Sequence, residues 1–304
     1  MAKLGFLGLG IMGGPMARHL LMAGHQVALW SHSQDKASAM AKHGNGIVCA
    51  TPAEVGTHSE CIFLCVGDTA MSRTVITGPK GIASTAKPGT VIADCSTIAP
   101  TESQHMAAEL RELGLHLLDA PCTGSKNGAE SGNLTFMVGG DEVVFERVRS
   151  FFEPMGKMLY YCGGSGMGLH AKLSQNLIIG NLLHAFNESF VLATKAGVPP
   201  ELLLEILNNS AAKSGLVAAK APLVFARNFE THFSVKWLEK DMSLMLESAD
   251  HLHVPLPLTS LSKQMFQEAI AKGYGEDDIC GAIRVLEEFA QVEVNSRERV
   301  SSSQ

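Results

Sequence analysis

Two polar side chains, Lys172 and Asn176, stand four residues apart in an apolar stretch of the chain. On a helix this spacing puts them one above the other on the same face, with Leu169 and Leu173 as near neighbours. A lysine held at an apolar domain junction loses solvation, which lowers its pKa toward the range where it exchanges a proton with a substrate hydroxyl. Asn176 would then orient the substrate or the lysine. The alternative interpretation is a surface lysine whose stem covers apolar neighbours while its ammonium reaches water.

Hydroxyl side chains follow two of the predicted strands. The segment DCSTIAP ends one strand, where Thr97 is well placed for a nicotinamide or a substrate carboxylate. The segment DAPCTGSK repeats the arrangement, with Thr123 and Ser125 beside Gly124, whose missing side chain lets a ligand approach the backbone N–H. Such a turn suits a small carboxylate. Each turn is equally explained by hydroxyls that cap their own backbone.

A glycine-rich turn predicts a dinucleotide site near the N-terminus. An apolar strand from Lys3 runs directly into a GxGxxG turn and then an amphipathic helix. Gly8 permits the tight turn, Gly10 lets the backbone approach a pyrophosphate, and Gly13 lets the helix pack on the strand. The helix N-terminus adds unpaired N–H groups and a positive dipole. We therefore assign cofactor contacts to the whole turn, Gly8, Leu9, Gly10, Ile11, Met12 and Gly13.

The order of predicted elements indicates two domains. Up to about Cys162, short apolar runs alternate with helical stretches, which predicts a largely parallel, doubly wound sheet of the Rossmann type. From Gly166 to about Gly197 the spacing is helical without a break, and the later segments are helical too. The predicted fold is α/β, with a Rossmann domain at 1–164, an all-helical substrate and dimerisation domain at 165–294 joined through the long helix, and a disordered tail at 295–304.

Composition excludes several classes of protein. The 304 residues are enough for two domains, and the net charge of −6, with scattered lysines and arginines, argues against nucleic-acid and membrane partners. The sequence has no secretory-type N-terminal segment and no uninterrupted apolar window of ~18 residues, so we expect a soluble, cytoplasmic protein. The seven cysteines form no CxxC pair and no zinc-finger spacing, which predicts reduced thiols and no metal.

Motifs along nearly the whole chain resemble the β-hydroxyacid dehydrogenases. This family includes 3-hydroxyisobutyrate dehydrogenase, tartronate semialdehyde reductase and the glyoxylate/succinic semialdehyde reductases. GFLGLGIMGGPMARHL is similar to the family's opening signature, DCSTIAP to its second motif, DAPCTGSKNGAESGNLTFMVGGD to its substrate segment, and GMGLHAKLSQNLIIG to its catalytic helix. The resemblance implies an NAD(P)-dependent oxidoreductase that interconverts a small β- or γ-hydroxy acid, or glycolate, and the corresponding semialdehyde or glyoxylate.

The resemblance also implies roles for individual residues. The catalytic lysine falls on Lys172, which would protonate the developing alkoxide or take the hydroxyl proton in reverse, with Asn176 orienting the substrate. Substrate contacts fall on Thr123, Gly124, Ser125 and Asp241. Phe233 and Lys240 match a segment that closes over the nicotinamide. The remaining cofactor contacts are Thr97, which would lie between cofactor and substrate, and Cys65 and Val66 at the end of a strand.

Cofactor preference is predicted from the end of the second strand. An acidic residue there would bind both ribose hydroxyls of NAD and repel the 2′-phosphate of NADP, but no carboxylate stands before Asp35. We therefore favour NADP(H), with Ser31, His32 and Ser33 as phosphate contacts. NAD(H) stays possible, because His32 replaces the arginine of the Asn-Arg-Thr usual in the semialdehyde reductases.

Substrate preference is predicted from the turn after Cys122. Gly124-Ser125-Lys126 stands where hydroxyisobutyrate dehydrogenases usually carry Gly-Gly-Val, which favours the glyoxylate/succinic semialdehyde reductase branch. Thr123 replaces the usual serine, and its methyl favours a short, carboxylate-bearing substrate. The alternatives are a 3-hydroxyisobutyrate dehydrogenase or tartronate semialdehyde reductase, a 6-phosphogluconate-type dehydrogenase, an imine reductase and an inactive dinucleotide-binding scaffold; the retained lysine argues against the last two. The apolar helical domain predicts a homodimer or homotetramer.

Overall fold

The structure is a computed structural model that describes residues 1–296. It divides into two compact units, unit 1 (Met1–Ser174) and unit 2 (Gln175–Gln304). The division falls inside one helix, α8 (Met167–Lys195), which begins in unit 1 and ends in unit 2. The disordered tail predicted at 295–304 lies outside the described residues from position 297 onward.

Unit 1 is built on one nine-stranded sheet. Its strands are β1 (Lys3–Leu7), β2 (Gln26–Trp30), β3 (Asn45–Val48), β4 (Cys61–Leu64), β5 (Val91–Asp94), β6 (His116–Asp119), β7 (Cys122–Thr123), β8 (Leu134–Gly139) and β9 (Gly156–Gly163). The strand order is β3-β2-β1-β4-β5-β6-β8-β7, with β9 paired to β8. The first six strands of this order are parallel, which confirms the predicted doubly wound sheet. Only the pairings of β8 with β6 and β7 are antiparallel among the described strands.

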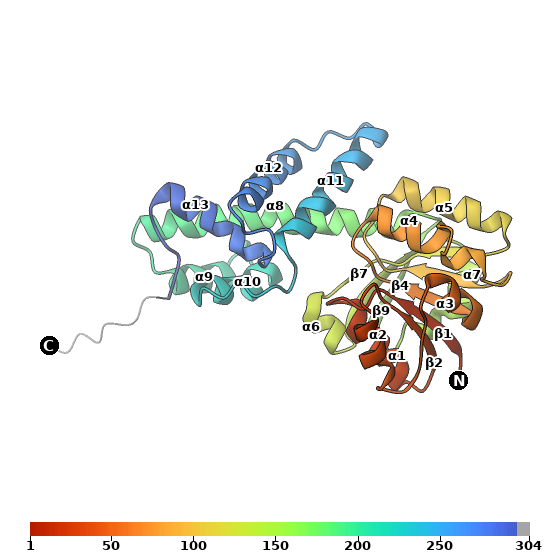
Figure 1. Ribbon diagram of the computed structural model, residues 1–304. Coiled ribbons are helices and arrows are strands. Elements are labelled where there is room, and N and C mark those ends of the chain that lie inside the picture. The colour runs from red at the N-terminus through yellow and green to blue at the C-terminus, as the bar shows by residue number, and fades with distance from the viewer. Residues whose placement is uncertain (297–304) are drawn as a thin grey trace. The chain divides into compact units, whose positions relative to one another are not determined.

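Helices cover both faces of this sheet. Neighbouring residues of a strand point to opposite faces, so each face contributes to its own buried cluster. On β4, Phe63 belongs to one buried cluster and Ile62 to the other. The first cluster receives side chains from α1 (Gly13–Met22), α2 (Gln34–Ala41), α6 (Ser125–Glu130) and α7 (Glu142–Val148). The second receives side chains from α3 (Pro52–His58), α4 (Thr69–Thr77) and α5 (Pro100–Glu112). In Figure 1, α4 and α5 lie on one side of the strands and α1 and α2 on the other.

Unit 2 is helical throughout its described part. After α8 come α9 (Pro200–Asn208), α10 (Gly215–Phe225), α11 (Val235–Leu252), α12 (Pro257–Ala271), the 3-10 turn η3 (Ile279–Ala282) and α13 (Ile283–Ala290). Unit 1 contains two further 3-10 turns, η1 (Ile82–Ser84) and η2 (Arg149–Phe151). Aromatic rings join α8 to α10, since the centroids of Phe186 and Phe190 lie 4.6 Å apart and those of Phe190 and Phe225 lie 5.6 Å apart. This all-helical second half confirms the predicted architecture.

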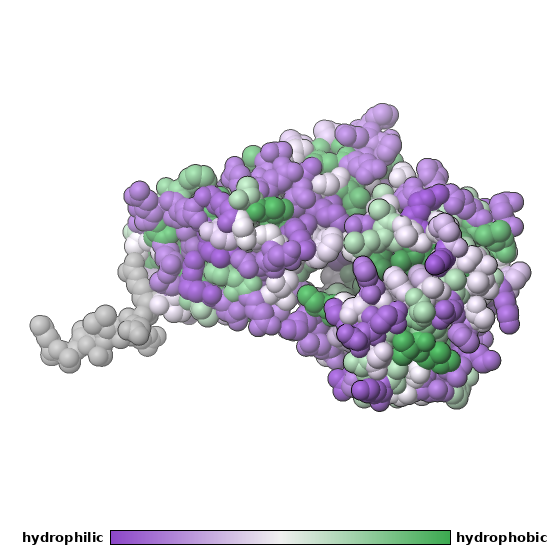
Figure 2. All heavy atoms as spheres, in the orientation of Figure 1, coloured by the Kyte–Doolittle hydropathy of each residue, from purple (hydrophilic) through white to green (hydrophobic). Residues whose placement is uncertain are grey.

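The 29-residue α8 confirms the long helix predicted between 166 and 197. Glycines with positive φ angles, Gly166 and Gly197, flank it. By length and composition alone α8 could cross a membrane, but it carries buried polar side chains, among them Asn176, His184 and Asn187. That pattern is typical of a helix inside a protein core. On the face shown in Figure 2, hydrophilic residues cover most of the surface and apolar residues form small scattered groups.

Candidate functional site

The glycine turn between β1 and α1 has the geometry of a dinucleotide site. Gly8 has a φ of +91°, and a Cβ atom there would lie 2.1 Å from the carbonyl oxygen of Cys65. A Cβ atom on Gly13 would lie 1.9 Å from the carbonyl oxygen of Gly8, whereas one on Gly10 would meet nothing within 4 Å. Gly8 and Gly13 are therefore required by the fold. No atom of the described residues lies where a side chain on Gly10 would stand, so packing does not require a glycine there. The open space would let a pyrophosphate approach the backbone.

The first turn of α1 is suited to an anion. Its N-cap residue, Met12, provides no side-chain hydrogen bond, and the turn contains no acidic residue. The N–H of Gly14 already donates to the carbonyl oxygen of Gly10 over 2.9 Å and Pro15 has no N–H, so it is the positive end of the helix dipole that favours a negatively charged ligand here. Of the other residues assigned to the turn, Leu9 is buried in the core and Ile11 is 53% exposed. These residues fit the dinucleotide that the sequence predicts.

The carboxyl ends of β2, β4 and β5 add the other residues assigned to the cofactor on unit 1. Ser31 is buried directly after β2, whereas His32 and Ser33 are exposed. Cys65 and Val66 follow β4, and Thr97 follows β5. Because adjacent parallel strands end at the same edge of a sheet, the structure brings these residues together with the glycine turn.

Buried polar contacts fix the loops after β4 and β5. The backbone N–H of Val66 donates to Ser96 Oγ over 2.9 Å, and the N–H of Ser96 donates to Asp94 Oδ1 over 2.9 Å. Ser72 Oγ donates to the other carboxylate oxygen of Asp94, which is 1% exposed. Sequence analysis did not identify this network, although an aspartate that ends a buried strand is an available signal. It holds the loops that carry Val66 and Thr97.

The turn predicted to bind a carboxylate joins β7 to α6. Gly124 has a φ of +135° and Ser125 has a φ of +57°, which is uncommon for a residue with a side chain. Both residues are exposed, while Thr123 is half-buried. His19 Nε2 lies 3.1 Å from the carbonyl oxygens of residues 129 and 130, so the end of α6 is tied to the cofactor helix α1.

Lys172 stands on the first part of α8, which belongs to unit 1 with this turn. Its residue is only 7% exposed, so nearly all of its surface is covered by the protein. Burial raises the pKa of the Cys122 thiol to about 11, and the ammonium of Lys172 acts in the opposite direction. Cys122 directly precedes Thr123, so this electrostatic effect agrees with a Lys172 ammonium beside the turn predicted to bind a carboxylate.

In unit 2, Asn176 is held by a carboxylate of α11. Its Nδ2 donates to Asp241 Oδ2 over 2.7 Å, and Lys240 Nζ pairs with Asp241 Oδ1 at 3.1 Å. Asn176 and Asp241 are 1% and 3% exposed. The amide oxygen of Asn176 is buried and accepts no hydrogen bond from the described residues. An unused buried acceptor of this kind suits a hydroxyl donor.

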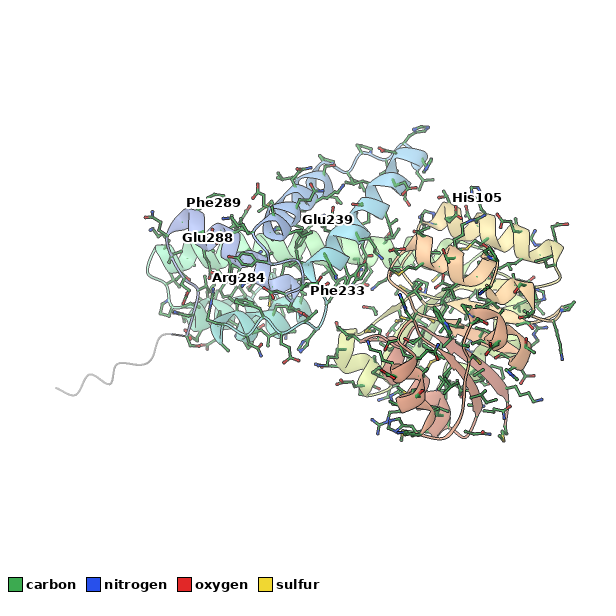
Figure 3. All side chains as sticks on the ribbon, viewed as in Figure 1. His105, Phe233, Glu239, Arg284, Glu288 and Phe289 are labelled. Atoms are coloured by element: carbon green, nitrogen blue, oxygen red, sulfur yellow. The ribbon has the colours of Figure 1, made fainter. Side chains whose placement is uncertain are left out.

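Phe233, labelled in Figure 3, is fixed by a buried ion pair. Its backbone N–H donates to Asp278 Oδ2 over 3.2 Å, and Asp278 also accepts the N–H of His232 over 3.1 Å. Lys220 Nζ donates to both oxygens of Asp278 over 2.7 and 2.8 Å. Asp278 is fully buried and Lys220 is 8% exposed. Sequence analysis missed this pair, because 58 residues separate its members.

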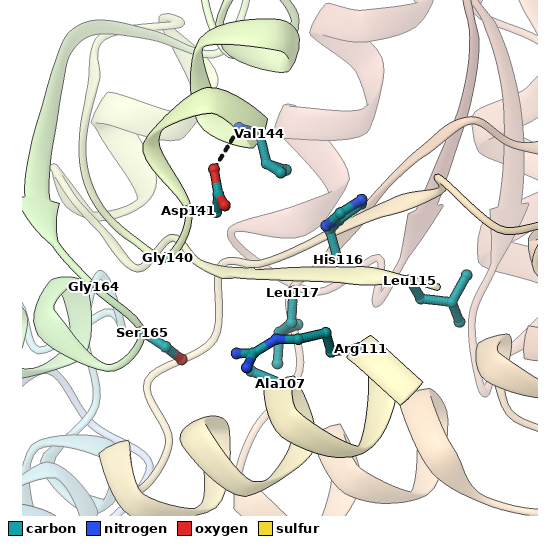
Figure 4. A pocket seen from close by; sticks show the side chains of 10 residues that line it. All are labelled: Ala107, Arg111, Leu115, His116, Leu117, Gly140, Asp141, Val144, Gly164 and Ser165. Atoms are coloured by element: carbon teal, nitrogen blue, oxygen red, sulfur yellow. Dashed lines mark hydrogen bonds between the residues drawn. The ribbon is translucent and has the colours of Figure 1, made fainter. Parts of the chain in front are cut away.

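A further hollow of unit 1 contains none of the residues assigned to the site. Its volume is about 370 Å³, and it is lined by side chains of α5, β6 and α7 and by the loop before α8, including Arg111, His116, Asp141 and Ser165 (Figure 4). Among residues 1–296, no three His, Cys, Asp or Glu side chains gather as they would around a metal ion.

Comparison with known proteins covers both units. The family model described as the NAD binding domain of 6-phosphogluconate dehydrogenase matches residues 3–164, and the one described as the NAD-binding domain of NADP-dependent 3-hydroxyisobutyrate dehydrogenase matches residues 166–286. The 2-(hydroxymethyl)glutarate dehydrogenase of Eubacterium barkeri is 35% identical over 96% of this chain and 97% of its own. The 2-hydroxy-3-oxopropionate reductase of Escherichia coli K12 is 35% identical over 95% of this chain and 98% of its own. The structure of Mycobacterium tuberculosis 3-hydroxyisobutyrate dehydrogenase with L-serine superposes with a TM-score of 0.87, at 29% identity over 94% of this chain and 99% of that one.

Proposed function

Because the chain belongs to the β-hydroxyacid dehydrogenase family and is an NAD(P)-dependent oxidoreductase of hydroxy and oxo acids, we propose that its substrate is short and that Lys172 is its general acid/base. The substrate pair is a small β- or γ-hydroxy acid, or glycolate, and the corresponding semialdehyde or glyoxylate. The observation that carries the proposal is the burial of Lys172, together with the electrostatic effect of its ammonium on the Cys122 thiol next to Thr123.

In this proposal, residues on α8 transfer the substrate proton and bind the substrate hydroxyl. A nicotinamide cofactor supplies or accepts the hydride when it is bound. Lys172 Nζ donates a proton to the substrate oxygen that gains charge as the carbonyl is reduced, and it accepts that proton in the reverse direction. One turn later, Asn176 has its amide nitrogen fixed by Asp241, so its unused Oδ1 is available to a substrate hydroxyl.

The turn after β7 holds the substrate carboxylate in this proposal. Gly124 and Ser125 offer backbone N–H groups, and Thr123 and Ser125 offer hydroxyl donors. The methyl group of Thr123 favours glyoxylate or a four-carbon semialdehyde over a branched acid, by about 1–3 kcal/mol for a group of that size. The E. coli relative named 2-hydroxy-3-oxopropionate reductase supports that oxo acid as the second candidate.

The cofactor favoured by this site is NADP(H). No carboxylate follows β2, and the exposed His32 and Ser33 are available to a 2′-phosphate, with Ser31 buried beside them. NAD(H) is the alternative. Gly8, Leu9, Gly10, Ile11, Met12 and Gly13 form the pyrophosphate turn, and Cys65, Val66, Thr97, Phe233 and Lys240 are the further cofactor contacts that we propose. We also propose a cytoplasmic homodimer or homotetramer.

Initial rates of wild type and Lys172→Ala test the proposal. Glyoxylate, succinic semialdehyde, 2-hydroxy-3-oxopropionate and 3-hydroxyisobutyrate are each supplied with both coenzymes in the matching redox state. We expect Lys172→Ala to lower kcat by about 10²- to 10⁴-fold, the usual contribution of a general acid, and to leave the Kd for NADPH within a few-fold. Lys195→Ala, an exposed lysine on the same helix, is the matched control. Full turnover in Lys172→Ala would eliminate this proton donor.

A further inference from the structure

The carboxylate of Asp119 holds the beginning of helix α8. Asp119 ends β6 and is 1% exposed. Its Oδ1 accepts the backbone N–H of Gly166 over 2.7 Å, and its Oδ2 accepts the N–H of Leu169 over 2.9 Å. An α-helix leaves the N–H groups of its first turn without partners inside the helix. Both oxygens of one buried side chain therefore fix the point at which α8 begins.

Close packing around this contact prevents the first turn of α8 from shifting. A Cβ atom on Gly168 would lie 2.3 Å from the carbonyl oxygen of Met137 and 2.8 Å from that of Asp119. A Cβ atom on Gly139 would lie 2.7 Å from both carboxylate oxygens of Asp119. The side chain of Leu169 is fully buried in the core cluster beneath α5. Strands β6 and β8 and the start of α8 thus fit together without room for side chains.

Lys172 follows Leu169 by three residues, or ~4.5 Å along the helix axis. A change in the height or rotation of the first turn would move the Lys172 ammonium by a similar amount. We propose that Asp119 is a positioning residue for the reaction: by fixing the start of α8, its carboxylate places the Lys172 ammonium beside the turn at Cys122 and Thr123. This inference rests on the proposed role of Lys172 as the proton donor.

A second capped helix in unit 1 shows what an ordinary cap looks like. Asp141 Oδ1 accepts the N–H groups of Val143 and Val144 over 2.9 and 3.1 Å at the start of α7, and Figure 4 draws the second of these contacts. Asp141 is exposed, and α7 carries no residue assigned to the site. At Asp119, by contrast, burial raises the pKa of the carboxyl to about 6, even though the N–H donors of Gly166 and Leu169 act in the opposite direction. Burying a carboxylate is unfavourable, so an exposed aspartate such as Asp141 would cap a helix at a lower cost in free energy.

The variant Asp119→Asn tests the inference, with Asp141→Asn as the matched control. The amide keeps the size of the carboxylate, but its NH₂ group faces an N–H donor, so one of the two contacts is lost. We expect kcat to fall by about 10- to 100-fold, as for a misplacement of the reacting groups by ~1 Å, and the Kd for NADPH to change by less than about threefold. Hydrogen exchange of the amides at 166–172 accelerates in Asp119→Asn only. Asp141→Asn keeps the wild-type kcat within about twofold.

A double-variant cycle separates positioning from general loosening of the fold. If Asp119 acts through Lys172, adding Asp119→Asn to Lys172→Ala lowers the residual rate by less than about twofold. Equal losses in the two backgrounds, or an unchanged kcat in Asp119→Asn, overturn the inference. If Asp119→Asn does not fold, Asp119→Ser keeps one acceptor for the N–H groups and carries the same test. A wild type that turns over none of the substrates refutes the proposed function instead, and hydrogen exchange still tests the cap.

Discussion

His184 makes the stability of unit 2 depend on pH. The imidazole is 5% exposed on α8, its Nε2–H donates to the carbonyl oxygen of Ser262 over 3.1 Å, and its ring lies 4.3 Å from that of Phe266. Its buried Nδ1 has no hydrogen-bond partner among the described residues. Burial lowers the pKa of His184 from 6.5 to about 4. The folded protein therefore holds this ring neutral at pH values where the unfolded chain protonates it.

The sign and size of the effect follow from the two pKa values. Between pH 6.5 and about pH 4, the unfolded state binds a proton that the folded state does not, so stability falls as the pH falls through that window. The full loss is about 3 kcal/mol, at about 1.4 kcal/mol for each pKa unit, and at pH 5 it amounts to about 2 kcal/mol. Above pH 6.5 the residue contributes no pH dependence.

Urea unfolding at pH 7.5 and pH 5.0 measures this loss. The chain has two tryptophans, so in a Trp30→Phe background the fluorescence of Trp237 reports on unit 2 alone. We expect His184→Gln, which keeps an N–H donor for Ser262, to lose about 2 kcal/mol less than the His184 protein on acidification. His105→Gln is the control, since that side chain is 73% exposed on α5 (Figure 3). The same loss in the His184 protein and in His184→Gln would refute the argument from burial.

Five other variants, in three comparisons, test roles that we propose for individual residues. Gly10→Ala folds normally but weakens NADPH binding by at least about tenfold in a fluorescence titration, whereas Gly13→Ala lowers the melting temperature, since only the latter Cβ clashes with backbone. Asp278→Ala lowers the free energy of unfolding by about 3–5 kcal/mol. Lys220→Met lowers it by less, because the Asp278 carboxylate then retains three backbone N–H donors. Urea unfolding that ranks the two variants in the opposite order would contradict this. His32→Asp shifts the ratio of kcat/KM toward NADH, through repulsion of the 2′-phosphate, and an unchanged ratio would place coenzyme selection elsewhere.

Local patterns predicted the parts of the fold that depend on neighbours in the sequence. The glycine turn is recognisable because Gly8, Gly10 and Gly13 all fall within six residues, directly after one strand. Helix α8 is recognisable because helical spacing continues without a proline across its length. The antiparallel pairing of β8 could not be predicted in this way, since a short apolar run carries no signal for strand direction.

The site is less predictable than the fold, because the contacts that shape it join distant parts of the chain. Asp119 meets Gly166 and Leu169 across 47 and 50 residues, and nothing in the segment DAPCTGSK distinguishes a capping aspartate from one that ends a strand. Sequence spacing could select Lys172 as a chemical group, but the position of its ammonium depends on where α8 begins. That starting point is fixed by a carboxylate and by the missing side chain of Gly168, which a pattern search treats as an ordinary helical glycine. Substitution of Gly168 should therefore impair the reaction much as loss of the Asp119 carboxylate does, since both changes act on the same turn.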